Sequence, residues 1–196
     1  MNTRSWTRRS LNQYVLEDDG SLTLFALFTL GVAAALLHQH LRFGLNIPGR
    51  HGLEWMTLLL FGRMQSRNPW AGLMTGSGAA MAYLVQSSFM LLAHDFKPAL
   101  IYLLNGVCLD LLFKVTPKGL PVIVKGVVLG GVSFLVKPVL DVPLAVLFEV
   151  TAGSLGKHGY YYPILTHFIF GSVGAVMGIY LATFTINYKN KTASRP

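Results

Sequence analysis

Polar and aromatic residues recur at intervals within an otherwise apolar sequence, and their types are those that bind small molecules. The candidate substrate-binding residues are Glu54, Trp55, Gln86, Tyr102, Asn105, Lys137 and His167. Tryptophan and tyrosine offer flat faces for stacking, whereas carboxylate, amide, ammonium and imidazole groups offer hydrogen bonds. Such a mixture is typical of pockets for small ring compounds. We expect these residues to line one site for a compound of that kind.

Each candidate also has a purely structural interpretation. Tryptophan and tyrosine collect at membrane interfaces, and histidines at helix ends are often solvated. His38, His40 and residues 160–162 belong to the same polar group. His38 and His40 are two residues apart, so on a helix they point in different directions and do not make a metal-binding pair. We expect no metal site.

The sequence carries no motif of a known catalytic machinery. HExxH, GxxxxGK[ST] and GxSxG are all absent from it. Glu54 could transfer protons, but no nucleophile or metal motif accompanies it. The single Cys108 lies in an apolar run, which excludes a disulfide framework within the chain. We therefore expect neither an enzyme nor a bound cofactor.

Composition indicates the elements that must position these residues. Hydrophobic residues make up 53% of the chain and charged residues 12%, with a mean hydropathy of +0.51, whereas soluble domains average roughly 25% charged residues. Six apolar runs occupy residues 21–41, 52–64, 70–93, 98–113, 120–136 and 162–188. They predict an all-α integral membrane protein: a compact bundle of about six transmembrane helices, the second of them short.

The segment 138–150 leaves the number of spans open. It is apolar but contains Asp141, Pro143 and Glu149. Acidic residues are costly in a span and proline disrupts helices. These residues favour an outer-face loop or interfacial helix over a seventh span.

Basic residues lie mainly on one side of the six-span arrangement. With the N-terminus inside, ten fall on the inner side: Arg4, Arg8, Arg9, Arg63, Arg67, Lys114, Lys118, Lys189, Lys191 and Arg195. Four fall outside: Arg42, Arg50, Lys97 and Lys157. The positive-inside rule then predicts a cell membrane protein with a cytoplasmic segment at 1–20, a membrane domain at 21–188 and a cytoplasmic tail at 189–196. Because the net charge of +8 comes from residues flanking apolar runs, it does not predict nucleic-acid binding.

Small residues repeat at four-residue spacing on three runs. The pairs and triplets are Gly31 and Ala35, then Gly72, Gly76 and Ala80, then Gly174 and Gly178. Such faces allow helices to approach closely, and internal packing accounts for most of them. The first run is dense enough in small residues that we expect Gly31 and Ala35 to contact a partner membrane subunit.

Three charged residues lie within or beside spans near the inner side. Asp110 and Lys114 are four residues apart on the fourth run, and Lys125 lies at similar depth on the fifth. This spacing predicts a structural ion pair, with coupling to a partner as the alternative.

The layout resembles the substrate-binding S component of energy-coupling factor (ECF) transporters. The resemblance lies in ALFTLGVAAALL, LNIPGRHG, LEWMTLLLFGR, NPWAGLMTGSGAAMAYL, PALIYLLNGVCLDLL and YYPILTHFIFG, which together cover most of the chain. It implies six helices that bind a vitamin or related micronutrient at their outward end. It also implies a membrane T subunit, docked on the small-residue face of the first helix, two ATPase subunits, and a lid formed by residues 42–51.

Two other kinds of protein fit the same sequence. An accessory or assembly subunit of a larger membrane complex would use the polar residues structurally and transport nothing. A membrane enzyme acting on a lipid or prenyl compound is a further alternative. Genes for ATPase and T subunits beside this one would favour the transporter over the accessory subunit.

Overall fold

Helices account for nearly all of the structure that the computed structural model describes, which covers residues 20–40, 47–89, 96–147 and 159–193. They are α2 (Gly20–His40), α3 (Gly52–Gln65), α4 (Ala71–Phe89), α5 (Lys97–Val115), α6 (Val122–Gly126), the π-helical η2 (Val127–Val132), α7 (Val136–Leu147) and α9 (Tyr161–Ala193). No strand occurs in these ranges. The all-α prediction is confirmed for them, and the second helix is short, at 14 residues.

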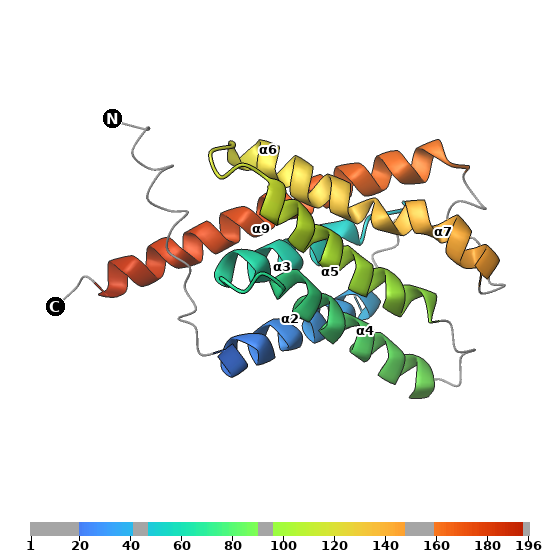
Figure 1. The fold of residues 1–196 in the computed structure, drawn as a ribbon, viewed down its shortest axis with the longest axis horizontal. Helices are drawn as coiled ribbons and strands as arrows, with labels where there is room; N and C mark the ends of the chain where they lie inside the picture. Colours follow the sequence, from blue (N-terminus) through green and yellow to red (C-terminus); the bar gives the residue numbers. More distant parts are fainter. Residues whose placement is uncertain (1–19, 41–46, 90–95, 148–158, 194–196) are drawn as a thin grey trace.

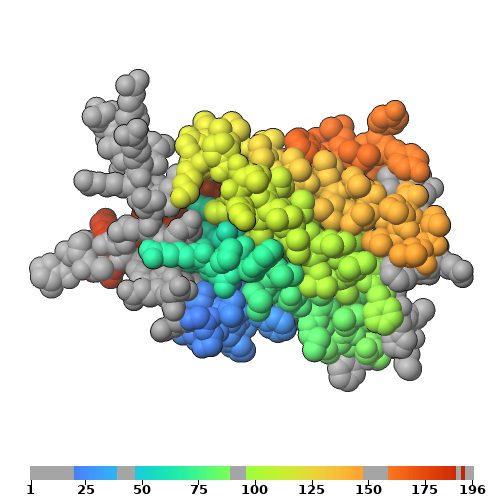
Figure 2. Space-filling model, viewed as in Figure 1, coloured from blue at the N-terminus to red at the C-terminus, as the bar shows by residue number. Residues whose placement is uncertain are grey.

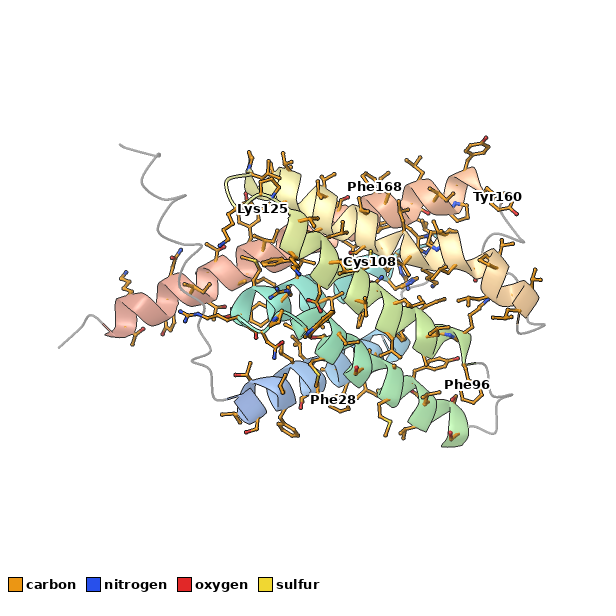
Figure 3. The ribbon with its side chains drawn as sticks, viewed as in Figure 1. Phe28, Phe96, Cys108, Lys125, Tyr160 and Phe168 are labelled. Atoms are coloured by element: carbon orange, nitrogen blue, oxygen red, sulfur yellow. The ribbon has the colours of Figure 1, made fainter. Side chains whose placement is uncertain are left out.

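Successive helices run in opposite directions along one bundle (Figure 1). The segment α6–η2–α7 acts as a single rod, so the bundle contains six rods in the described ranges. We name its two ends after residues at them. The His51 end holds the start of α3, with Phe96 and Tyr160 nearby, and the Arg63 end holds the end of α3 and Lys125 (Figure 3).

Within the described ranges, four helices are long and apolar enough to cross a membrane. They cover Gly20–His38, Lys97–Val115, Val122–Leu147 and Tyr161–Tyr188. Large apolar side chains are exposed along the outside of α9 at helical spacing: Leu165, Ile169, Val173, Met177, Tyr180, Leu181, Phe184 and Tyr188. A continuous exposed apolar stripe of this kind suits contact with lipid.

Residues 138–147 do not form the separate loop or interfacial helix that we expected. They belong to α7, which continues the rod of α6 and η2, and the three together form one apolar stretch of 26 residues. Pro143 lies inside α7. The expected fifth span at 120–136 is therefore extended by about three turns, and residues 148–150 lie outside the described ranges.

The small-residue face of α2 packs on α4 within the chain. A Cβ atom added to Gly31 would lie 1.9 Å from the carbonyl oxygen of Thr75, and one added to Gly78 would lie 2.0 Å from that of Phe28. Ala35 is also buried, with 2% of its surface exposed. Gly31 and Ala35 thus serve internal packing, which corrects the expectation that they contact a partner subunit.

Other glycines bring further helix pairs into backbone contact. Gly72 of α4 and Gly106 of α5 pack against each other, as do Gly130 of η2 and Gly171 of α9. Gly178 of α9 packs on the carbonyl oxygen of Thr57 in α3. Figure 2 shows the outcome on one face, where α4, α5 and α7 lie side by side.

Asp110 links three helices at the Arg63 end. Its carboxylate accepts hydrogen bonds from the backbone N–H groups of Gly72 and Leu73, at 2.9 and 2.8 Å, in the first turn of α4. Arg63 Nε of α3 lies 3.0 Å from Asp110 Oδ1, and the arginine also stacks on Phe113. A carboxylate at a helix N-terminus satisfies N–H groups that have no partner within the helix.

The ion pair predicted between Asp110 and Lys114 is therefore wrong. Lys114 is exposed, whereas Arg63 reaches Asp110 from a helix that is distant in sequence. Lys125 donates instead to the carbonyl oxygen of Lys118, at 2.6 Å. The expectation that these charges have a structural role holds, but with different partners.

Gly31→Leu should destabilise the bundle, because a side chain at this position would collide with the backbone of α4. We expect a loss of about 1–3 kcal/mol or more, as for overpacked cores, measured as a lower melting temperature of the purified protein in detergent. Gly119→Leu is the control, since nothing lies within 4 Å of a Cβ added there. Equal melting temperatures for Gly31→Leu and wild type would contradict the packing described here.

Asp110→Asn should remove the charge that balances Arg63 and weaken the cap of α4. Breaking a buried ion pair by changing one partner costs about 3–5 kcal/mol. The measurement is again thermal unfolding in detergent. Lys114→Gln should leave the melting temperature unchanged. A comparable fall in melting temperature in both variants would instead support an ion pair between Asp110 and Lys114.

Candidate functional site

A tight turn before α3 packs against the beginning of α9. Gly49 in this turn has φ of +78°, a conformation that residues with a side chain rarely adopt. A Cβ added to Gly49 would lie 2.8 Å from the backbone of His167. Both constraints require glycine, and together they fix the position of His51, two residues later. Residues 42–46 of the expected lid lie outside the described ranges.

His51 lies at the centre of a cluster of rings from four parts of the chain. Its ring centroid is 4.6 Å from that of His38 on α2, 5.3 Å from Phe134 and 5.7 Å from His167 on α9. Phe134 in turn stacks on His167 at 5.2 Å. Lys137 Nζ lies 2.9 Å from His51 Nε2. Because an ammonium group only donates, His51 accepts at Nε2 and carries its proton on Nδ1.

A second aromatic group lies one turn further along α3. Trp55, which is almost fully buried, packs on Tyr102 of α5 at a centroid distance of 4.9 Å. Tyr83 of α4 lies 6.5 Å from Tyr102 on a different side. These rings join three helices next to the His51 cluster, since Trp55 follows His51 by one helical turn.

An ion pair stabilises the same end of the bundle. Lys97 Nζ of α5 lies 2.8 Å from Asp141 Oδ1 of α7, and both side chains are buried. Asp141 follows Lys137 by four residues, so the two lie on one face of α7. The acid at 141 that argued against a helix in the membrane is therefore neutralised by a lysine from a neighbouring helix.

Four buried polar atoms at this end have no hydrogen-bond partner among the described residues. They are Glu54 Oε2 on α3, Gln86 Oε1 on α4, Asn105 Oδ1 on α5 and His167 Nε2 on α9. Asn105 and His167 are each only 1% exposed. A buried polar atom that lacks a partner costs about 1–3 kcal/mol. Gln65 Nε2, at the Arg63 end, is also without a partner.

Four of the seven expected site residues lie in the two neighbouring groups just described. Trp55 and Tyr102 are in direct contact, and Lys137 and His167 both contact His51. Glu54 precedes Trp55, whereas Gln86 and Asn105 each lie one turn beyond a tyrosine of the aromatic group. Residues 160–162 are exposed, up to 92% for Tyr161, and take no part. The side chain of His40 lies outside the described part of the structure.

Little in the sequence distinguishes His51, Phe134 and Tyr83 as site residues. His51 follows a Pro-Gly turn and precedes Glu54 by three residues, which is one turn of helix. That spacing was the available signal. Phe134 and Tyr83 are aromatic residues within apolar runs, and only the packing of the helices shows that they face the site.

Comparisons of the chain with models of protein families, with curated proteins and with solved structures found no match. Within the described ranges, no three His, Cys, Asp or Glu residues are arranged to hold a metal ion. The geometry itself therefore carries the functional argument.

His51 should make the stability of the protein depend on pH. Its burial, followed by the nearby charge of Lys137, lowers its pKa well below the ordinary value of 6.5; His38, His167 and Arg50 contribute in the same direction. The unfolded chain takes up the proton near pH 6.5 and the folded chain does not. The contribution of His51 is therefore complete above pH 6.5 and is lost as the pH falls below it, by at most about 1.4 kcal/mol per unit.

The measurement is the melting temperature of wild type and His51→Asn between pH 8 and pH 5. We expect the melting temperature to fall more steeply below pH 6.5 in wild type than in the variant. Parallel curves would show that His51 has the same proton affinity in both states.

Proposed function

We propose that this chain is the membrane-embedded, substrate-binding subunit of a micronutrient uptake transporter, working with a membrane T subunit and ATPases. The substrate binds at the His51 end, between α3, α4, α5 and α9. The resemblance to S components supports the class of protein, and the arrangement of the polar residues supports the place of binding.

The observation that carries the proposal is the set of four buried hydrogen-bonding atoms from four helices. Glu54, Gln86, Asn105 and His167 are distant in sequence, yet all lie in the half of the bundle that contains His51. Polar groups with no partner in the surrounding protein are costly in an apolar bundle. A ligand that hydrogen bonds to them would recover this cost.

The distribution of basic residues supports an outward-facing site. Described basic residues at the Arg63 end are Arg63, Arg67, Lys114, Lys118, Lys125 and Lys191, against Arg50, Lys97 and Lys137 at the His51 end. By the positive-inside rule, the Arg63 end faces the cytoplasm. The protein would then receive its substrate from the side of the membrane that faces away from the cytoplasm.

Contact with the T subunit has to use residues other than Gly31 and Ala35. Those two are buried against α4, whereas Leu22, Phe25, Leu36 and Leu37 of the same helix are exposed. The proposal therefore retains the first helix as a contact but moves the contact to its apolar outer face.

The proposal is tested by gentle purification from membranes, followed by mass spectrometry of the small molecules that remain bound. We expect a ring-containing micronutrient to be retained, and titration of the substrate-free protein to reproduce its binding. Trp55→Ala should weaken that binding by roughly 1–3 kcal/mol, using the stacking of bases on aromatic side chains as a guide.

Trp70→Ala is the matched control. Trp70 is half exposed and precedes α4 at the Arg63 end, so its removal should leave binding unchanged. If no molecule is retained and a panel of vitamins and precursors fails to bind, the protein is an accessory subunit of a larger membrane complex instead.

A further inference from the structure

We infer that the ligand is a planar ring compound whose hydrogen-bonding edge consists of N–H donors, such as an exocyclic amine or an amidine, and not of carboxylate or phosphate oxygens. This inference rests on the proposed function and specifies its substrate class. It follows from the kind of atom that the protein leaves without a partner.

All four unpartnered atoms at the His51 end are hydrogen-bond acceptors. Glu54 Oε2 is a carboxylate oxygen, and Gln86 Oε1 and Asn105 Oδ1 are amide oxygens. An ionised carboxylate accepts hydrogen bonds and donates none. A ligand edge made of oxygens without protons would bring lone pairs against lone pairs at each of these atoms.

The fourth atom, on His167, is an acceptor because of how its ring is held. Nδ1 lies 2.6 Å from the carbonyl oxygen of Pro163. A carbonyl oxygen can only accept, so Nδ1 donates and carries the proton of the neutral ring. Nε2 then presents a lone pair, and it is buried without a partner among the described residues.

The two lysines at this end do not supply an anion site. Lys97 forms the buried ion pair with Asp141 at 2.8 Å. Lys137 donates to His51 and shares a face of α7 with Asp141. Both ammonium groups therefore already interact with groups of the protein. The buried hydrogen-bonding atoms at this end that lack a partner among the described residues are the four acceptors.

The flat shape of the ligand follows from the neighbouring rings. Trp55 follows Glu54 on α3, Tyr102 precedes Asn105 by three residues on α5, and the two rings contact each other at 4.9 Å. Aromatic faces attract planar rings, and more strongly those that carry positive charge. An amino-substituted nitrogen heterocycle satisfies both the acceptors and the rings.

The first experiment compares ring compounds that differ only in their polar group. The probes are benzamidine and benzoate, then 4-aminopyrimidine and pyrimidine-4-carboxylate, each added to the full chain in detergent and followed by saturation-transfer NMR. We expect the amidine and the amine to bind at least tenfold more tightly than the corresponding acids. Tighter binding of the acids would overturn the inference but leave the proposed function standing, because a ring compound would still bind.

The second experiment substitutes the residues that carry the acceptor atoms. Asn105→Asp keeps the acceptor and removes the amide donor, so it should retain 4-aminopyrimidine binding, whereas Asn105→Leu should lose it. Glu54→Gln should weaken benzamidine binding by about tenfold. Gln65→Leu at the opposite end is the control and should change neither affinity. Melting temperatures confirm that each variant is folded.

Loss of 4-aminopyrimidine binding in folded Asn105→Asp would overturn the inference, because the amide donor would then be the group that matters. Failure of all four probes to bind would overturn it as well. The proposed function is judged separately, by the molecule that wild-type protein retains from the membrane.

Discussion

Within an apolar bundle, every buried polar group needs a partner, and this constraint explains how the two ends of the structure differ. At the Arg63 end the chain supplies the partners of Asp110, which receives Arg63 and two N–H groups of α4; Gln65 Nε2 is the atom there that lacks a hydrogen-bond partner in the described ranges. At the His51 end, four acceptors are left without a protein partner in the described ranges. Contacts within the chain thus hold the Arg63 end together, and under the proposed function a ligand supplies the partners at the His51 end.

The constraint also explains why the helices approach so closely. Gly31 meets the backbone of α4, and Gly130 meets that of α9. Because lipid provides no hydrophobic driving force between helices, helices in a membrane associate through close packing and hydrogen bonds. Contacts of backbone on backbone leave little freedom to slide, so the side chains of the site project from a rigid frame. A rigid frame reduces the entropy that a ligand has to remove on binding.

Much of the architecture could be predicted from the sequence, because hydropathy, glycine spacing and proline position are local signals. The short second helix and five of the six runs agree with the helices of the structure to within a few residues. The run that differs is the fifth, which continues through residues 138–147. Asp141 considered alone argues against a helix there, whereas in the structure Lys97 of another helix neutralises it. Partners distant in sequence leave no trace in local composition.

The same reason accounts for the errors in the site. Asp110 was assigned to Lys114, its neighbour by helical spacing, although Arg63 of α3 is the actual partner. Gly31 was assigned to another subunit because its face is rich in small residues, and only the structure shows α4 against it. The candidate ligand residues were chosen by the depth of each within its run. Depth places these residues toward one end of the bundle, but it indicates neither His51 nor the shared polarity of the acceptors.

The length of α3 has an electrical consequence. Its 14 residues span about 21 Å, whereas the hydrocarbon core of a bilayer is about 30 Å thick. In the proposed orientation, with the Arg63 end at one boundary, the start of α3 lies roughly 9 Å below the other boundary. Glu54, two residues further along the helix, then lies about 12 Å below it, inside the region across which the membrane potential falls. Moving one charge through the whole potential involves about 2.3 kcal/mol per 100 mV, so reaching Glu54 involves about two fifths of that, or ~0.9 kcal/mol. Under the proposed function and orientation, the voltage of an energised membrane draws a positively charged ligand toward the proposed site and holds a negatively charged one back.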